Sequence, residues 1–66
     1  MQVMINGEAR EVPDSLNVTA LLAHLGITAE RVAIERNRDI LPRSAWPETT
    51  VDVGDSFEIV HFVGGG

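Results

Sequence analysis

The 66-residue chain has the length and composition of one small folded domain. It is 44% hydrophobic and 23% charged, and ten acidic residues against five Arg and no Lys give a net charge of −5. This charge disfavours nucleic acids and anionic membrane surfaces as partners, because both are bound by clustered cations. The absence of Cys excludes disulfides, thiolate zinc sites and cysteine nucleophiles.

The chain shows no targeting or membrane-spanning pattern. Residues 1–10 lack a basic stretch followed by an apolar run of signal-peptide length. No apolar run approaches the roughly 20 residues that a transmembrane helix needs. We therefore expect a cytoplasmic protein.

The first predicted element is a β-hairpin. Apolar residues alternate in residues 2–6, Asn6-Gly7 follows, and residues 8–12 would form the return strand before Pro13. Asn-Gly favours a type I′ turn, which requires positive φ at both central positions and joins hairpin strands.

One helix is predicted after the hairpin. Val18, Leu21, Leu22 and Leu25 follow the i, i+3, i+4, i+7 spacing of a helix with one apolar face. Asn17 is a favourable N-cap, and Gly26 is placed to end the helix in a left-handed conformation.

The second half of the chain predicts short strands. We expect a short strand that begins with the run 32–34 and ends at Asn37-Arg38-Asp39, and further strands at residues 49–53 and 56–63. We also expect a brief extended piece at 40–42 and a turn or single helical turn at 43–48. This order predicts an α+β fold of the β-grasp type, with a mixed sheet of four to five strands packed on one helix. The domain would span residues 1–63, and residues 64–66 would form a flexible C-terminal glycine tail.

No enzyme active site is expected. His24 and His61 lack metal-like spacing to carboxylates and have no nucleophile and orienting group beside them. Asp52 and Asp55 flank Gly54 in a segment that would use Asp as a turn residue. We therefore predict no catalytic residue, no metal site and no cofactor.

The three terminal glycines are the most informative residues. Gly64, Gly65 and Gly66 carry no Cβ, so they could pass as bare backbone through a narrow channel on another protein. The chain ends on the α-carboxylate of Gly66, which is ionised at neutral pH. Coupling to AMP would turn this carboxylate into a mixed anhydride that a sulfur or nitrogen nucleophile can attack. The tail has the character of a substrate.

The last predicted strand has two distinct faces. Phe57 and Ile59 fall on one face, and Glu58, Val60 and Phe62 fall on the other. If Phe57 and Ile59 pack on the helix, Val60 and Phe62 face outward beside the tail. Exposed apolar pairs at such a place are typical of partner-binding surfaces.

Taken together, these segments resemble the ThiS family, the ubiquitin-like β-grasp sulfur carriers of thiamine biosynthesis that end in Gly-Gly. The resemblance covers essentially the full chain. It is carried by residues 1–7, 18–25, 32–37, 41–43 with Trp46, 54–55 and 59–66.

The resemblance implies a carrier cycle. An E1-like adenylyltransferase of the ThiF type would adenylate Gly66, and a persulfide donor protein would then supply the sulfur of a thiocarboxylate. A thiazole synthase of the ThiG type would receive that sulfur. The chain would be a co-substrate of these enzymes, with Gly65 and Gly66 matching the functional tail and Gly64 a third glycine before it.

Two alternatives remain open at this point. The small subunit of molybdopterin synthase shares the fold and the Gly-Gly end, although it approaches its tail through a Pro-containing segment that this chain lacks. A non-covalent β-grasp interaction module with an incidental tail is the other. Self-conjugation through a Lys side chain, as in ubiquitin chains, is excluded because the chain has no Lys.

Overall fold

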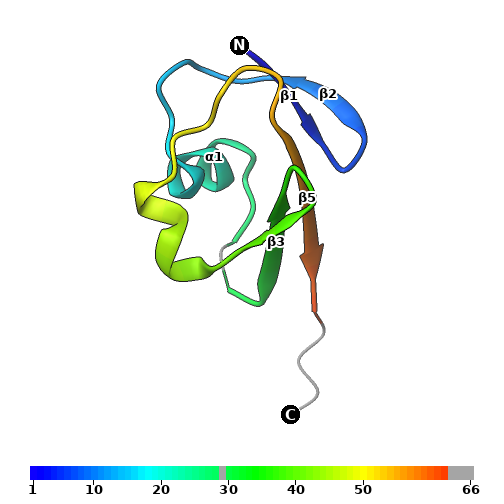
Figure 1. The fold of residues 1–66 in the computed structure, drawn as a ribbon, viewed down its shortest axis with the longest axis vertical. Helices are drawn as coiled ribbons and strands as arrows, with labels where there is room; N and C mark the ends of the chain where they lie inside the picture. The colour runs from blue at the N-terminus through cyan, green and yellow to red at the C-terminus, as the bar shows by residue number, and fades with distance from the viewer. Residues whose placement is uncertain (29, 63–66) are drawn as a thin grey trace.

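A computed structural model describes residues 1–28 and 30–62 of the chain. The strands form one mixed five-stranded sheet. The helical elements pack on one side of it (Figure 1). The sheet order is β2-β1-β5-β3-β4, with β1 and β5 parallel and the other neighbours antiparallel. The predicted β-grasp fold is confirmed. The elements in chain order are β1 (Gln2–Ile5), β2 (Glu8–Glu11), α1 (Val18–His24), β3 (Val32–Arg36), β4 (Asp39–Leu41), the 3₁₀ helix η1 (Arg43–Glu48) and β5 (Ser56–His61).

The opening hairpin turns at the two residues that the sequence predicts. Asn6 has φ of 51° and Gly7 has φ of 82°, as a type I′ turn requires. Ile5 and Glu8 are paired directly before and after this two-residue loop. The turn therefore fixes the register of β1 against β2.

Helix α1 begins and ends at the predicted caps. The side chain of Asn17 accepts a hydrogen bond from the Ala20 N–H at 2.7 Å. At the other end Gly26 has φ of 73°, and the Ile27 N–H donates to the Leu22 carbonyl at 3.0 Å. These are the features of a Schellman motif, so the helix is stopped within two turns of its start.

The core lies between α1, η1 and the inner face of the sheet. The indole of Trp46 in η1 is buried, and its N–H donates to the Leu41 carbonyl at 3.1 Å. The Arg43 guanidinium lies 4.7 Å from the centre of the Trp46 ring, which is within cation–π range. The buried apolar side chains are Val3, Ile5, Val12, Val18, Leu21, Leu22, Val32, Ile34, Trp46, Val51, Phe57 and Ile59.

The prediction of a strand at residues 49–53 is wrong. The segment forms one isolated antiparallel bridge, between Thr50 and Asn17, and the Val51 N–H donates to the Leu16 carbonyl at 2.8 Å. Val51 is buried, so the alternating pattern in the sequence is real. However, this segment pairs with the loop that precedes α1 and not with the sheet.

Other strand boundaries differ from the sequence prediction by one or two residues, beginning with β2, which ends at Glu11 and not at Val12. The extended piece predicted at 40–42 is β4, which begins one residue earlier at Asp39 and ends before Pro42, the N-cap of η1. Strand β5 ends at His61, two residues before the predicted end, and Val63 lies outside the described residues.

Candidate functional site

The predicted modification site lies at the C-terminal end of the chain, beyond the last strand. Gly64, Gly65 and Gly66 lie outside the described residues, so their predicted roles stay predictions. Their nearest structural support is β5, which lies in the middle of the sheet between β1 and β3. The described part of the candidate site is therefore β5 and the residues that hold it in place.

The two faces of β5 are as the sequence predicts. Phe57 and Ile59 point into the core, with exposed fractions of 0% and 5%. Val60 and Phe62 keep 56% and 51% of their surface exposed. The assignment of the strand faces is confirmed, whereas partner binding by Val60 and Phe62 stays a prediction.

The sheet has an outer face that no described segment covers. The strand register places Ala33 beside Val60, Glu35 beside Glu58, and Ile40 beside Glu35. All of these side chains are exposed, with Ile40 at 80%. We call this surface the outer face; it comprises Ala33, Glu35, Ile40, Glu58, Val60 and Phe62. Every second residue of a strand lies on the same face, so the sequence of β3 could have assigned Ala33 and Glu35 to this surface as well.

Asn6 holds the middle of β5 where β1 ends. Its backbone N–H donates to the Phe57 carbonyl at 2.8 Å. Its side-chain Nδ2 donates to the Ile59 carbonyl at 3.1 Å, and its Oδ1 accepts the Ile59 N–H at 2.7 Å. The side chain thus makes the two hydrogen bonds to β5 that the backbone of a longer β1 would make. Sequence reasoning recognised Asn6 as a turn residue and missed this second role.

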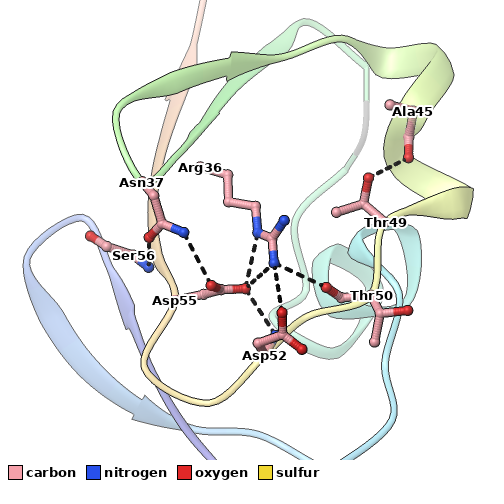
Figure 2. Close-up of polar contacts among 8 residues, drawn as sticks. All are labelled: Arg36, Asn37, Ala45, Thr49, Thr50, Asp52, Asp55 and Ser56. Carbon is pink, nitrogen blue, oxygen red and sulfur yellow. Dashed lines mark hydrogen bonds and ion pairs between the residues drawn. The ribbon is translucent and has the colours of Figure 1, made fainter.

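A polar network fixes the start of β5 (Figure 2). The Arg36 guanidinium donates from Nε and Nη2 to Asp55 Oδ2 at 3.0 and 2.9 Å, and from Nη2 to Asp52 Oδ2 at 3.0 Å. Asn37 Nδ2 donates to Asp55 Oδ1 at 3.2 Å, while Asn37 Oδ1 accepts the Ser56 N–H at 3.0 Å. These contacts tie the end of β3 to the turn that leads into β5.

Asp55 is the buried centre of this network. It is 6% exposed, and its Oδ2 also accepts the Asp52 N–H at 2.8 Å. Burial by itself would raise the pKa of Asp55, but the hydrogen bonds from the Asp52 N–H and Asn37 and the Arg36 guanidinium outweigh it and lower the pKa below its ordinary value. The sequence identified Asp52 and Asp55 only as turn residues. Their hydrogen-bond partner Arg36 is distant in the sequence, so the residues around Asp52 and Asp55 do not reveal the pairing.

Neither His side chain belongs to a cluster of possible metal ligands within the described residues. His24 and His61 are both exposed, and no group of three or more His, Asp or Glu side chains in residues 1–28 and 30–62 could hold a metal ion. Within the same part of the chain we find no cavity of ligand size. No described helix is long and apolar enough to cross a membrane.

Comparison with known proteins is consistent across sequence and structure. Residues 3–66 match the ThiS family. The chain is 34% identical to the sulfur carrier protein ThiS of Bacillus subtilis, over 97% of this chain and 98% of that protein. All 66 residues of this chain align, at 47% identity, with a thiazole synthase of Paramagnetospirillum magneticum, but they span only 20% of the length of that protein.

A solved structure shows the same fold. The crystal structure of the thiamine biosynthesis protein ThiS from Geobacter metallireducens superposes with a TM-score of 0.87 and 43% sequence identity, covering all of both chains. A family match over nearly the whole sequence and a full-length structural match agree. The chain therefore belongs to the ThiS family, the sulfur carriers of thiamine biosynthesis.

Proposed function

We propose that this protein carries sulfur as a thiocarboxylate on Gly66 and donates it for formation of the thiazole ring of thiamine. The observation that carries the proposal is a ThiS-family domain whose central strand β5 is followed in the sequence, after Phe62 and Val63, by three glycines. The family match favours thiamine synthesis over the alternative of the molybdopterin pathway.

The chemistry requires activation of a poor electrophile. An E1-like adenylyltransferase joins the Gly66 carboxylate to AMP from ATP and releases pyrophosphate. The terminal sulfur of a protein persulfide then attacks the acyl carbon, AMP leaves, and an acyl disulfide links the two proteins. A thiol cleaves that disulfide, which leaves the thiocarboxylate on Gly66 and a new disulfide that includes the donor sulfur.

The domain takes part as a co-substrate and supplies no reacting side chain. Its contribution is to hold β5 through Asn6 at the middle and the Arg36–Asp55 pair at the start. A fixed strand lets a partner enzyme bind the domain and receive the tail in a defined position. The reactive groups that handle AMP and sulfur belong to the partner enzymes.

Three partners follow from this cycle: a ThiF-type adenylyltransferase, a persulfide donor protein and a ThiG-type thiazole synthase. The similarity to one fifth of a thiazole synthase supports the last of these, because it joins a carrier-like segment and a synthase in one polypeptide. Val60 and Phe62 would provide apolar contacts to these enzymes. We place the cycle in the cytoplasm, since persulfides and thiocarboxylates need a reducing compartment and the chain carries no Cys.

Intact-mass spectrometry tests the proposal. The protein is incubated with ATP, a persulfide donor and a ThiF-type adenylyltransferase, and the C-terminal peptide is then mapped. We expect one oxygen of Gly66 to be replaced by sulfur, and no change in a matched chain that lacks Gly65 and Gly66. An unchanged mass, obtained with an enzyme that modifies another ThiS protein in parallel, would contradict the proposal.

A further inference from the structure

The pairing of β3 with β5 determines which way each backbone group of β5 points. The Phe62 N–H donates to the Arg31 carbonyl at 2.9 Å, and His61 lies opposite Val32. In an antiparallel pair, residues that exchange hydrogen bonds alternate with residues that do not. Hence Val60 and Phe62 bond toward β3, and the N–H and C=O of His61 point to the opposite side of β5.

On that opposite side, other residues form hydrogen bonds with only part of β5. The Phe57 carbonyl and both backbone groups of Ile59 are bonded by Asn6. His61 is the next residue with groups on this side, and β1 has already ended at Ile5. Among residues 1–28 and 30–62, no hydrogen bond is made to the backbone of His61 on this side. In Figure 1, the lower half of β5 has β3 on one side and no strand on the other.

The open edge at His61 differs from the two outer edges of the sheet. Strand β2 has charged side chains at three of its four positions, and β4 is three residues long. Charge and shortness are the usual means by which proteins prevent strands from pairing at an edge. The open edge at His61 is short, but it carries no acidic or basic side chain like those of β2 and is flanked by the exposed apolar side chains of Val60 and Phe62.

We propose that the open edge of β5 at His61 binds an extended segment of the adenylyltransferase that receives the C-terminal tail, and that this segment joins the sheet in line with β1. The N–H donor and C=O acceptor of His61 would form one bridge of the main-chain hydrogen bonding by which an added strand binds a sheet edge. Side chains of that strand would lie beside Val60 and Phe62 and extend the outer face.

The identity of the protein that binds this edge is inferred from the short length of chain between His61 and Gly66, and the inference rests on the proposed function. Gly66 is five residues after His61, which is at most about 17 Å of extended chain. An enzyme that holds the Gly66 carboxylate in its active site therefore has its own surface close to this edge. Strand addition would align the tail with the active site before the chemistry begins.

A proline at position 61 tests the role of the backbone. His61→Pro removes the N–H that points to the open edge and places the ring there, but it removes no hydrogen bond to β3. His61→Ala is the reference, because it loses the imidazole and keeps the N–H. With a ThiF-type adenylyltransferase, we expect the KM for the His61→Pro protein to exceed that for His61→Ala by about tenfold, equivalent to about 1.4 kcal/mol. Equal KM values for the two variants would overturn the proposal.

A measurement on the unsubstituted chain gives an independent test. The His61 amide should exchange rapidly with solvent in the free protein and become protected when the adenylyltransferase binds. Failure of protection would overturn strand addition even if Gly66 is adenylated normally, whereas loss of adenylation in the unsubstituted chain would instead contradict the proposed function. A dimer of the free protein that His61→Pro dissociates would also overturn the proposal, since it would assign the edge to a second copy.

Discussion

Asn6 and Ile59 are joined by two hydrogen bonds across 53 positions of sequence. The Asn6 side chain accepts from the Ile59 N–H at 2.7 Å and donates to the Ile59 carbonyl at 3.1 Å. It therefore lengthens the parallel pairing of β1 with β5 beyond the last residue of β1. The same residue has the positive φ of the hairpin turn, so one side chain links the beginning of the fold to its last strand.

Asn6→Gly isolates the contribution of this side chain. Glycine accepts the positive φ of position 6, so the turn is retained while both bonds to Ile59 are lost. We expect the free energy of unfolding to fall by about 1–3 kcal/mol, because two backbone groups lose their partner. For a domain of this size each kcal/mol lowers Tm by about 4–8 °C. Thermal unfolding followed by circular dichroism measures the change.

Asn6→Asp provides the matched control. The carboxylate can still accept from the Ile59 N–H, but it cannot donate to the Ile59 carbonyl and repels it. We expect this variant also to be less stable than the parent. An Asn6→Gly protein as stable as the parent would show that the Ile59 bonds contribute nothing net.

Asp55→Asn should remove a pH-dependent part of the stability. The pKa of Asp55 is lowered in the folded protein, so its stabilising effect is complete above the unfolded pKa of about 3.9 and is lost as pH falls through the folded value. At pH 7 we expect a loss of about 1–3 kcal/mol, since the partly buried Arg36 loses the carboxylate that accepts from its Nε and Nη2 and keeps only the exposed Asp52 as a charged partner. Urea unfolding across pH 2.5–7 should show the parent and the variant converging at the acidic end.

Asp52→Asn is the control for the Asp55 experiment. The Asp52 side chain also pairs with Arg36, at 3.0 Å, but it is 70% exposed. Exposed ion pairs contribute little, so we expect a loss of less than about 1 kcal/mol. A larger loss for Asp52→Asn than for Asp55→Asn would contradict the assignment of Asp55 as the centre of the network.

Reversal of one charge on the outer face should stabilise the domain. Glu35 and Glu58 lie directly opposite each other on β3 and β5, and like charges in this position destabilise a sheet. We expect Glu58→Arg to raise the free energy of unfolding by about 0.2–1 kcal/mol, with a smaller gain for Glu58→Gln. Urea unfolding at low and high salt checks this, because screening should reduce the gain. A loss of stability in both variants would show that the two carboxylates do not repel.

Val60→Asp and Phe62→Asp test the apolar part of the outer face. Both side chains are about half exposed, so we expect Tm to change by only a few degrees, while affinity for a ThiF-type enzyme falls by about tenfold or more. Isothermal titration calorimetry measures the affinity. Ile40→Asp is the control, since Ile40 is 80% exposed on the same face but lies on β4. An equal loss of affinity for Ile40→Asp would show that general acidity, and not loss of the Val60 and Phe62 contacts, is responsible.

Local features of the fold could be predicted from the sequence. The hairpin turn at Asn6-Gly7 and the caps at Asn17 and Gly26 depend on φ preferences and side-chain bonds within a few residues. The inward positions of Phe57 and Ile59 follow from the two-residue period of a strand. These predictions succeeded because each depends on neighbours in the sequence.

The long-range features could not be predicted in this way. Residues 49–53 have the alternation of a strand, but their partner is the loop before α1, and no local pattern distinguishes a loop from a sheet as a partner. Arg36 reaches Asp55 across 19 positions, and Asn6 reaches Ile59 across 53. A charged or amide side chain in a turn looks the same in sequence whether it contacts solvent or a distant strand.

The central position of β5 has a mechanical consequence. A protein that grips the tail and pulls along the strand acts on hydrogen bonds to β1 on one side and to β3 on the other. Because those bonds lie across the direction of pull, they are loaded in shear and resist together, whereas a strand at the sheet margin can be peeled away one bond at a time. In the proposed cycle, the domain would therefore serve as a rigid body while the adenylyltransferase, and then the thiazole synthase, binds its terminus.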